Sequence, residues 1–209
     1  MKFLNRDDAG QKLLEKLQFL KDEKNVIILG LPRGGVVVAK KIAENLKLPL
    51  DIIITRKIGF PQNEELAIGA VDDEGNYIIN EFITKIYSLS ENYIQAKIRR
   101  EALEAKRRLK EYRKNKKTLN LKNKIAVLID DGIATGFTMK AAINSCLKKN
   151  AAKIIIASPV IAKQNLDLLA PLVDKVIYVI APEEMHSISQ YYKEFEQTTD
   201  EKVEKILNW

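Results

Sequence analysis

Short runs of apolar residues alternate with amphipathic stretches along most of the chain. Runs of three to five Val, Ile and Leu residues are typical of strands that are buried on both faces of a sheet. We expect such strands at residues 26–29, 52–54, 125–129, 154–157 and 176–180. Apolar positions three or four apart predict helices at residues 36–46, 138–148 and 163–169, and an N-terminal helix at 7–20 with Leu13, Leu14, Leu17 and Leu20 on one face.

This alternation of strands and helices predicts a three-layer α/β/α sandwich around a mainly parallel sheet. A long excursion, residues 56–124, separates the second and third strands, with weaker strand candidates at 66–71 and 77–79 and then a charged helix. The chain shows no internal repeat and no low-complexity linker, so we expect a single domain over residues 1–209. In such sheets ligands bind beyond the carboxyl ends of the strands.

Composition limits the class of protein. The chain has 209 residues, of which 30% are charged and 46% apolar, which suits a globular protein with a sizeable core. No apolar run approaches the roughly 18 residues of a membrane span, and the first residues, MKFLNRDDAG, lack the apolar segment of a secretory signal. The single cysteine, Cys146, excludes an internal disulfide and a Cys-based zinc site. We therefore expect a cytoplasmic protein with no membrane partner.

The net charge of +7 is concentrated in one segment. Residues 97–117 hold eleven Lys and Arg residues against three Glu residues, so the rest of the chain is close to neutral. One interpretation is a solvated helix with ion pairs four residues apart: Lys97 with Glu101, Glu104 with Arg108, and Arg107 with Glu111. The alternative is a helix that faces an anion, either nucleic acid or a phosphorylated ligand.

The stretch VLIDDGIATGFT ends an expected strand with two adjacent carboxylates, Asp130 and Asp131, and continues as a loop of small residues. Adjacent carboxylates repel each other unless a cation or a hydrogen-bond donor faces them. A vicinal diol offers two donors, and a magnesium complex offers positive charge and water. The loop can cradle a phosphate with backbone amides and the hydroxyls of Thr135 and Thr138, although a plain turn with either threonine as N-cap is also compatible. Together, pair and loop fit a ribose 5-phosphate.

A second glycine-rich loop, GLPRGG at residues 30–35, follows the first expected strand. It lacks the G-x-G-x-x-G spacing of a dinucleotide-binding fold, and the chain has no G-x-x-x-x-G-K-[ST] sequence. These two common nucleotide-binding loops are therefore excluded.

The stretch VLIDDGIATGFT resembles the signature of type I phosphoribosyltransferases, which bind phosphoribosyl diphosphate (PRPP). FLNRDDAGQKL, LGLPRGGVVVA, RKIGFPQNEELAIGAV, AKRRLKEYR and YYKEFEQTTDEKV are similar to a subgroup described only as predicted phosphoribosyltransferases. The resemblance covers nearly the whole chain and implies a core sheet with one antiparallel edge strand and a small hood over the base side. We expect the hood to include parts of the N-terminus, residues 56–80 and residues 182–209, with Tyr191 and Tyr192 available for stacking.

The resemblance also implies roles for individual residues. Asp130 and Asp131 match the acidic pair that holds the ribose 2- and 3-hydroxyls. The residues that match the 5-phosphate loop are Gly132, Ile133, Ala134, Thr135, Gly136 and Thr138. The residues that match the pyrophosphate loop, where a strained non-proline peptide is common in the wider family, are Arg33, Gly34 and Gly35. Arg56 and Lys57 lie at the base of a mobile loop that closes over the ligand. Alternatively, these three cations are ordinary surface or loop charges.

These roles predict transfer of a phosphoribosyl group from PRPP to a nitrogenous, base-like acceptor with release of pyrophosphate. Catalysis would depend on Asp130, Asp131, Arg33 and Lys57, with Mg²⁺ bound mainly through PRPP and no protein ligand assigned. The only histidine, His186, is either a surface residue or part of the base pocket. A homodimer is compatible with the sequence. The alternative function is a regulator that senses PRPP or nucleotides and binds nucleic acid through residues 97–117.

Overall fold

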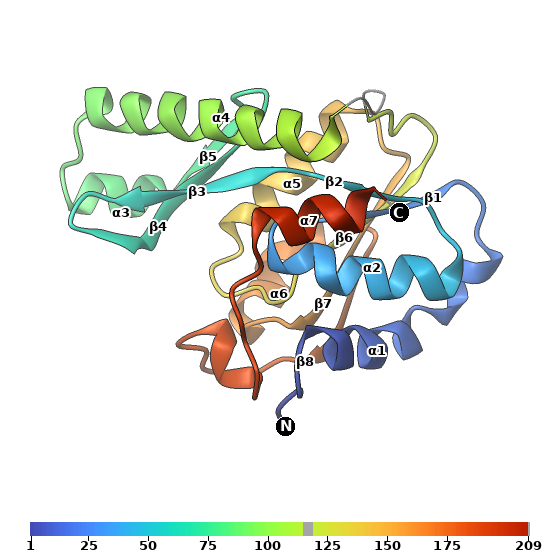
Figure 1. Cartoon of the computed structure of the whole chain (residues 1–209). Helices are drawn as coiled ribbons and strands as arrows, with labels where there is room; N and C mark the ends of the chain where they lie inside the picture. Colours follow the sequence, from blue (N-terminus) through green and yellow to red (C-terminus); the bar gives the residue numbers. More distant parts are fainter. Residues whose placement is uncertain (115–118, 209) are drawn as a thin grey trace.

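The computed structural model describes residues 1–114 and 119–208 and is organised around a five-stranded parallel sheet (Figure 1). In spatial order β2-β1-β6-β7-β8, its strands are Leu50–Ile52, Val26–Gly30, Ile125–Ile129, Lys153–Val160 and Lys175–Ile180. The two central strands, β1 and β6, are buried along their whole length, as their unbroken apolar runs predict. The chain passes from β1 to β2 on one side and returns with β6 on the other. The strand order therefore reverses between β1 and β6, where α/β sheets bind ligands.

Helices cover both faces of this sheet. On one face, α1 (Arg6–Lys16) and α2 (Gly34–Leu46) pack against alternate strand residues such as Ile28 and Val127. On the other face, α5 (Phe137–Lys148) and α6 (Lys163–Leu169) pack against the intervening residues, among them Leu29 and Leu128. The predicted three-layer α/β/α architecture is confirmed. The predicted N-terminal helix is shorter than expected, because α1 gives way to a 3₁₀ helix at Gln18–Asp22.

The long excursion forms a separate unit, residues 55–113, that we call the arm (Figure 1). Its three-stranded antiparallel sheet consists of β3 (Thr55–Phe60), β4 (Asn63–Asp72) and β5 (Tyr77–Ile79). Two helices follow, α3 (Glu81–Ile86) and α4 (Glu91–Arg113), and α4 packs Ile94 and Ile98 onto the sheet. The expected antiparallel edge strand of the core sheet is therefore wrong. The tight connection at residues 61–62 pairs β3 with β4 instead, and this local hairpin forms its own sheet.

The two ends of the chain pack on different parts of the core. Phe3 near the N-terminus is buried beside Tyr192, and its backbone N–H donates to Tyr191 O at 2.8 Å. The C-terminal helix α7 (Asp200–Leu207) packs with α2, α4 and the edge strand β2. The N-terminal and C-terminal parts of the expected hood therefore meet, whereas its third part, residues 56–80, belongs to the arm. Two 3₁₀ helices, Ala170–Leu172 and Ile188–Tyr191, complete the described elements.

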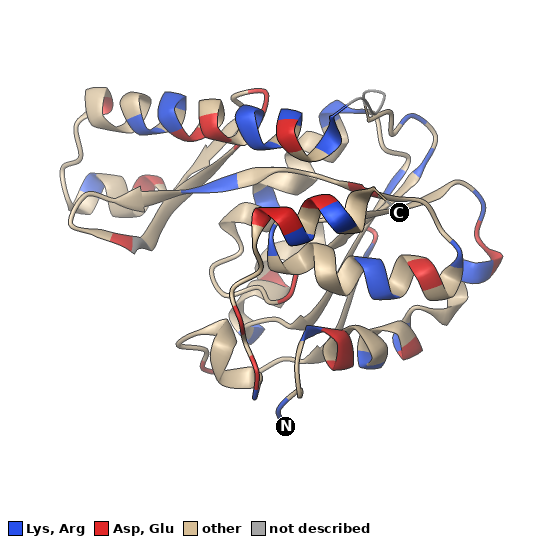
Figure 2. Cartoon of the chain, in the orientation of Figure 1, with Lys and Arg blue, Asp and Glu red and all other residues tan. Residues whose placement is uncertain are grey.

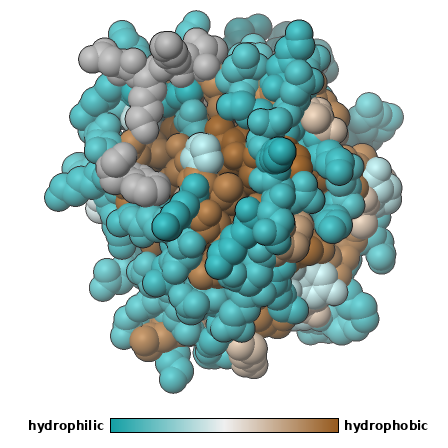
Figure 3. All heavy atoms as spheres, turned by 90° about the vertical axis from the view of Figure 1, so that its right-hand side faces the viewer, coloured by the Kyte–Doolittle hydropathy of each residue, from teal (hydrophilic) through white to brown (hydrophobic). Residues whose placement is uncertain are grey.

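On the side of the molecule that Figure 3 shows, hydrophilic side chains predominate and hydrophobic ones show between them. Within residues 1–114 and 119–208, no helix is both long and apolar enough to cross a bilayer.

Candidate active site

The two glycine-rich loops lie against each other at the carboxyl ends of β1 and β6. These strands are paired in parallel, with Gly30 opposite Ile129, so the loops that follow them leave the sheet side by side. A Cβ atom added at Gly34 would lie 1.9 Å from Asp131 Oδ2, and one added at Gly35 would lie 2.6 Å from Ile129 O and 3.0 Å from Asp130 Oδ1. Only glycine allows this approach, since no side chain fits in these gaps. The structure thus brings the acidic pair and the predicted pyrophosphate loop together.

Asp131 is buried and forms an ion pair with Arg6, which is near the N-terminal end of the sequence. Arg6 Nε donates to Asp131 Oδ2 at 2.7 Å, and the two side chains are only 12% and 11% exposed. The same arginine donates from Nη1 to Glu196 O at 2.6 Å, and its guanidinium group lies 3.9 Å from the centre of the Phe195 ring. The backbone carbonyl of Asp131 accepts a hydrogen bond from the Tyr192 hydroxyl at 2.6 Å. Asp131 is therefore a fixed junction between the N-terminal and C-terminal segments.

Asp130 is in a different environment, although it is the next residue. It is partly buried, and its Oδ1 accepts the backbone N–H of Asp131 at 2.9 Å. Burial raises the pKa of Asp130 well above its ordinary value, and the neighbouring charge of Asp131 raises it further. Asp130 is the carboxylate of the pair whose charge Arg6 does not directly neutralise. Arg6 thus supplies the cation that the sequence requires for Asp131, whereas Asp130 has no direct ion pair in the described part of the chain.

The predicted 5-phosphate loop begins α5. Gly136 has φ of +76° and is the N-cap of α5 without a side-chain capping bond, so neither threonine acts as the cap. The first backbone N–H groups of α5 thus lack a side-chain acceptor at the N-cap, the arrangement that binds anions at helix N-termini. The carbonyl of Ala134 accepts Asn165 Nδ2 at 2.6 Å, and this bond fixes the loop to α6. Thr135 is exposed and Thr138 is partly exposed.

Two residues of this loop have packing contacts. Gly132 is buried beneath Ile188, whose side chain a Cβ at Gly132 would approach to 2.5 Å. Ile133 is buried in the core cluster next to α5, and its N–H donates to Val160 O at 2.9 Å. The backbone of these residues can serve a ligand, whereas the Ile133 side chain belongs to the core.

Arg33 is held from the C-terminal side of the molecule. The peptide bond between Pro32 and Arg33 is cis, which fits the unusual non-proline peptide that the family resemblance implies at this loop. Arg33 Nη1 lies 3.8 Å from Asp200 Oδ1 at the start of α7, and the Tyr112 hydroxyl of α4 donates to the same carboxylate. Arg33 is thus part of a cluster with Tyr112 and Asp200, which connects α4 and α7 to the loop.

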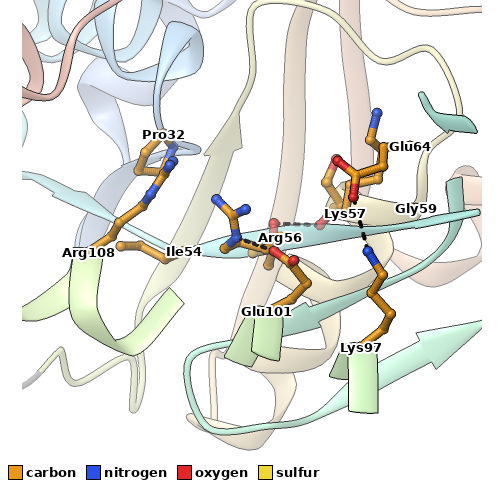
Figure 4. Close-up of a pocket in the computed structure, with 11 residues that line it drawn as sticks. Pro32, Ile54, Arg56, Lys57, Gly59, Glu64, Lys97, Glu101 and Arg108 are labelled. Carbon is orange, nitrogen blue, oxygen red and sulfur yellow. Dashed lines mark hydrogen bonds and ion pairs between the residues drawn. The ribbon is translucent and has the colours of Figure 1, made fainter. Parts of the chain in front are cut away.

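Arg56 and Lys57 lie in β3, opposite Val71 and Ala70, and line a cleft of about 310 Å³ (Figure 4). The cleft is bounded by the loop residue Pro32, by the first turn of α5 at Thr138, and by α4. The lining residues are Pro32, Ile54, Thr55, Arg56, Lys57, Gly59, Glu64, Lys97, Glu101, Arg108 and Thr138. Thr55 Oγ1 donates to Thr138 O at 3.2 Å, so β3 is fixed to the 5-phosphate loop. The cleft therefore adjoins both predicted phosphate-binding loops.

The basic helix differs in part from its prediction. The pairs of Glu104 with Arg108 and of Arg107 with Glu111, both at 2.8 Å, are confirmed. The pair of Lys97 with Glu101 is wrong, because both side chains point off the helix toward the hairpin. Lys97 contacts Glu64 at 3.0 Å, and Glu101 accepts from Arg56 at 2.6 Å. The helix ends at Arg113, and Lys116 and Lys117 lie outside the described residues.

Two further predictions concern the base side. Tyr192 is buried, with its hydroxyl bonded to Asp131 O, so the prediction that it is available for stacking is wrong. Tyr191 is partly exposed and donates its hydroxyl to Glu184 O at 3.0 Å. The side chain of His186 is exposed on the segment between β8 and the 3₁₀ helix.

Sequence reasoning missed the residues that hold the site from a distance, namely Arg6, Tyr112 and Asp200. Each of them lies within a stretch that resembles the family, FLNRDDAGQKL, AKRRLKEYR or YYKEFEQTTDEKV, or next to one. The family resemblance of these stretches was the signal that could have pointed to the three residues. It could not indicate a partner, because these residues are far from Asp131 and Arg33 in sequence.

The described side chains do not form a metal site by themselves. In the part of the chain that the structure describes, no three His, Cys, Asp or Glu side chains are grouped so that they could hold a metal ion. A magnesium ion commonly keeps several waters and is bound by one or two carboxylates together with substrate phosphates. The residues present are compatible with an ion that arrives with a diphosphate ligand.

Comparison with known proteins assigns the chain to a family. A model of the phosphoribosyl transferase domain matches residues 4–186, so the chain belongs to the phosphoribosyl transferase family. It is 36% identical over 206 residues to a protein of Mycobacterium tuberculosis (strain H37Rv) named "Putative phosphoribosyl transferase Rv0571c". The match covers 99% of this chain and 46% of the relative, so the chain spans about half the length of the curated relatives it matches.

Two solved structures share the fold of this chain. The crystal structure of TT1426 from Thermus thermophilus is 33% identical, with a TM-score of 0.81 over 99% of this chain and 98% of that chain. A hypoxanthine phosphoribosyltransferase from Staphylococcus aureus is 14% identical, with a TM-score of 0.50 over 88% of this chain and 78% of that one. The second likeness concerns the fold alone.

Proposed function

We propose that this chain transfers the phosphoribosyl group of PRPP to a nitrogenous acceptor and releases pyrophosphate. The observation that carries the proposal is the contact between the two glycine-rich loops. It places the carboxylates of Asp130 and Asp131 against Gly34 and Gly35 at the point where the strand order reverses. A ligand bound there meets acceptors for hydroxyl groups and donors for phosphate groups within one site.

Each part of PRPP has a matching group in the chain. The ribose hydroxyls would donate to Asp130, whose carboxylate is not neutralised by a direct ion pair, while Asp131 keeps the loop in place through Arg6. The 5-phosphate would bind at the N-terminus of α5, where backbone N–H groups and the helix dipole favour an anion. The pyrophosphate would bind beside Arg33 and the cleft that contains Arg56 and Lys57.

The reaction breaks the bond between the anomeric carbon and the pyrophosphate oxygen and forms a bond from that carbon to the acceptor nitrogen. The electron pair of the broken bond leaves with pyrophosphate, and the acceptor nitrogen loses its proton to solvent or to a nearby base. Cations placed where this charge develops are typically worth about 3 kcal/mol each. Magnesium, when bound with PRPP, supplies further positive charge to the leaving group. Arg33, Arg56 and Lys57 would orient that group, and Asp130 would fix the ribose.

The test is binding followed by turnover. With Mg²⁺, PRPP should raise the melting temperature, because a ligand that binds only the native state stabilises it by mass action. Pyrophosphate release should then appear with at least one member of a panel of nucleobases and amines. Absence of PRPP and ribose 5-phosphate binding in calorimetry would overturn the proposal. PRPP binding without turnover, together with tight binding of nucleic acid, would favour the regulatory function instead.

A further inference from the structure

The face of α4 that borders the cleft carries its own cations. Lys97, Glu101 and Arg108 all line the cleft, and their separations of four and eleven residues are close to whole numbers of helical turns. They therefore share one face of α4, a helix that carries both basic and acidic residues along its length (Figure 2). Within the cleft, two carboxylates, Glu64 and Glu101, stand against four cations, Arg56, Lys57, Lys97 and Arg108. The cleft is net positive.

Arg108 occupies the end of the cleft next to the predicted pyrophosphate loop. Its side chain extends from α4 toward Pro32, the residue before Arg33 (Figure 4). One turn further along α4, Tyr112 bonds to Asp200, which pairs with Arg33. Burial and the bond to Asp200 raise the pKa of Tyr112, and the positive charges of Arg108 and Arg33 act against this rise. Arg108 and Arg33 therefore approach the loop from neighbouring directions.

Arg108 can leave its present partner, Glu104, at a small cost in free energy. Arg108 donates Nε to Glu104 Oε1 at 2.8 Å, and its side chain is 21% exposed. Glu104 is also held by Arg107, which donates Nε at 2.7 Å and Nη2 at 3.0 Å. If Arg108 turned to an anion in the cleft, Glu104 would keep its partner. The bond of Arg108 to Glu104 uses Nε, which leaves the two terminal nitrogens for a bidentate contact of the kind that arginine makes with phosphate.

We propose that Arg108 of α4 is an additional ligand for the diphosphate group of the substrate and of the pyrophosphate product. This inference rests on the proposed function and extends the anion site from the loops to a helix of the arm. It also gives a function to one residue of the basic segment 97–117, which the two glycine-rich loops do not explain. Arg108 would add positive charge from α4 of the arm to the charge that Arg33 supplies from the core loop.

The experiment compares Arg108→Ala with Arg107→Ala, a matched control on the same helix. Arg107 shares the Glu104 partner but is 54% exposed and does not line the cleft. Calorimetry with Mg²⁺ would measure binding of PRPP, inorganic pyrophosphate and ribose 5-phosphate. Arg108→Ala should weaken the first two by about tenfold, the loss of one hydrogen-bonded contact to a charged group. Binding of ribose 5-phosphate should change by less than about twofold, and Arg107→Ala should leave all three ligands unaffected.

Each contrary outcome is distinct. Equal effects of the two substitutions, or an equal loss of ribose 5-phosphate and pyrophosphate binding, would overturn the role of Arg108 while leaving the proposed function intact. Failure of the wild-type protein to bind any of the three ligands would overturn both. If thermal melts show that Arg108→Ala is poorly folded, Arg108→Gln keeps the length of the side chain and removes its charge. It should then show the same selective loss.

Discussion

The acidic side and the cationic side of the site are held by ion pairs of two kinds. On the acidic side, Asp131 and Arg6 are both nearly buried, and their bond joins residues 125 positions apart. On the cationic side, the pairs include more exposed partners, such as Glu64, whose side chain is 71% exposed. Removing one partner of a buried pair is strongly destabilising, whereas exposed pairs contribute little and exchange readily with solvent ions. We therefore expect the acidic side to act as a fixed template and the exposed pairs of the cationic side to exchange their partners for a ligand, whereas the pair of Arg56 with the buried Glu101 is less exchangeable.

The largest effects are expected from substitutions of Asp130 and Asp131, and we expect the two substitutions to differ. Asp130→Asn should reduce activity by about a hundredfold or more, in line with loss of a preorganised transition-state group. It should leave the free energy of unfolding of the ligand-free protein level or slightly higher, because it removes a charge held near Asp131. Asp131→Asn should instead lower that free energy by roughly 3 kcal/mol, because Arg6 loses its buried counter-charge. Thermal and denaturant melts with and without PRPP and Mg²⁺ measure both quantities.

The opposite pattern would contradict this assignment. If Asp130→Asn were the destabilising substitution and retained PRPP affinity, Asp130 would be structural and Asp131 the ligand contact. Arg6→Met is the matched control, since it removes the partner of Asp131 without touching the acidic pair itself. It should destabilise the protein about as much as Asp131→Asn.

The second expected effect concerns Arg33. Arg33→Ala should weaken PRPP and pyrophosphate by tenfold or more, the value of a charge-assisted contact, and should change binding of a nucleoside monophosphate much less, because that ligand has no pyrophosphate. Asp200→Asn is the control, since it releases Arg33 from its present partner. Titration calorimetry measures all three ligands. Equal weakening of all three by Arg33→Ala would mean that Arg33 only positions the loop.

A third, smaller effect is a dependence on pH. The pKa of Asp130 is raised in the native protein, whereas a carboxyl group in the unfolded chain has a pKa of about 3.9. Between these two pKa values the native protein binds a proton that the unfolded chain has released. The free energy of unfolding should therefore fall as pH rises from about 4 through the native pKa of Asp130. Ribose hydroxyls favour the ionised form, so PRPP binding should release a proton in the same window. Calorimetry in two buffers of different ionisation enthalpy detects this release. Asp130→Asn should abolish it, and an unchanged release would assign the proton to another group.

The smallest effect is expected for the basic residues that follow α4 in the sequence. Reversing Lys114, Lys116 and Lys117 to Glu should leave PRPP binding within about threefold, since Lys114 is 55% exposed and pairs with Glu204 away from the cleft. Filter binding to nucleic acid at two salt concentrations gives the complementary measurement. Tight binding with a steep salt dependence, abolished by the three substitutions, would support the regulatory alternative.

The core could be predicted from the sequence because its signals are local. The run at residues 125–129 is buried on both faces, and its strand has the predicted bounds. Where the strands are parallel, the loops at their carboxyl ends must lie at one edge, so the acidic pair and the GLPRGG loop could be placed there together. The glycines identify the residues at which the two loops approach each other.

The supporting contacts could not be predicted, because they join elements that are far apart in sequence. Helical spacing suggested a pair of Lys97 and Glu101, yet the hairpin supplies Glu64 and Arg56 as nearer partners. Tyr192 was expected at the surface of the base pocket, but packing against Phe3 and the carbonyl of Asp131 bury it. Such choices depend on how the arm and the chain ends pack against the core, and hydrophobic periodicity carries no information about that.

The contacts of Arg6 bear on the order in which the site is completed. One side chain joins residue 131 in the middle of the chain to residues 195–196 near its end. During synthesis the sheet can begin to form from the N-terminal side, but Arg6 can make its contacts with Phe195 and Glu196 only after those two residues have emerged. The acidic pair thus acquires its final surroundings only after residue 196 has been made, and we expect ligand binding to require that the segments around Arg6 and Phe195 have packed together.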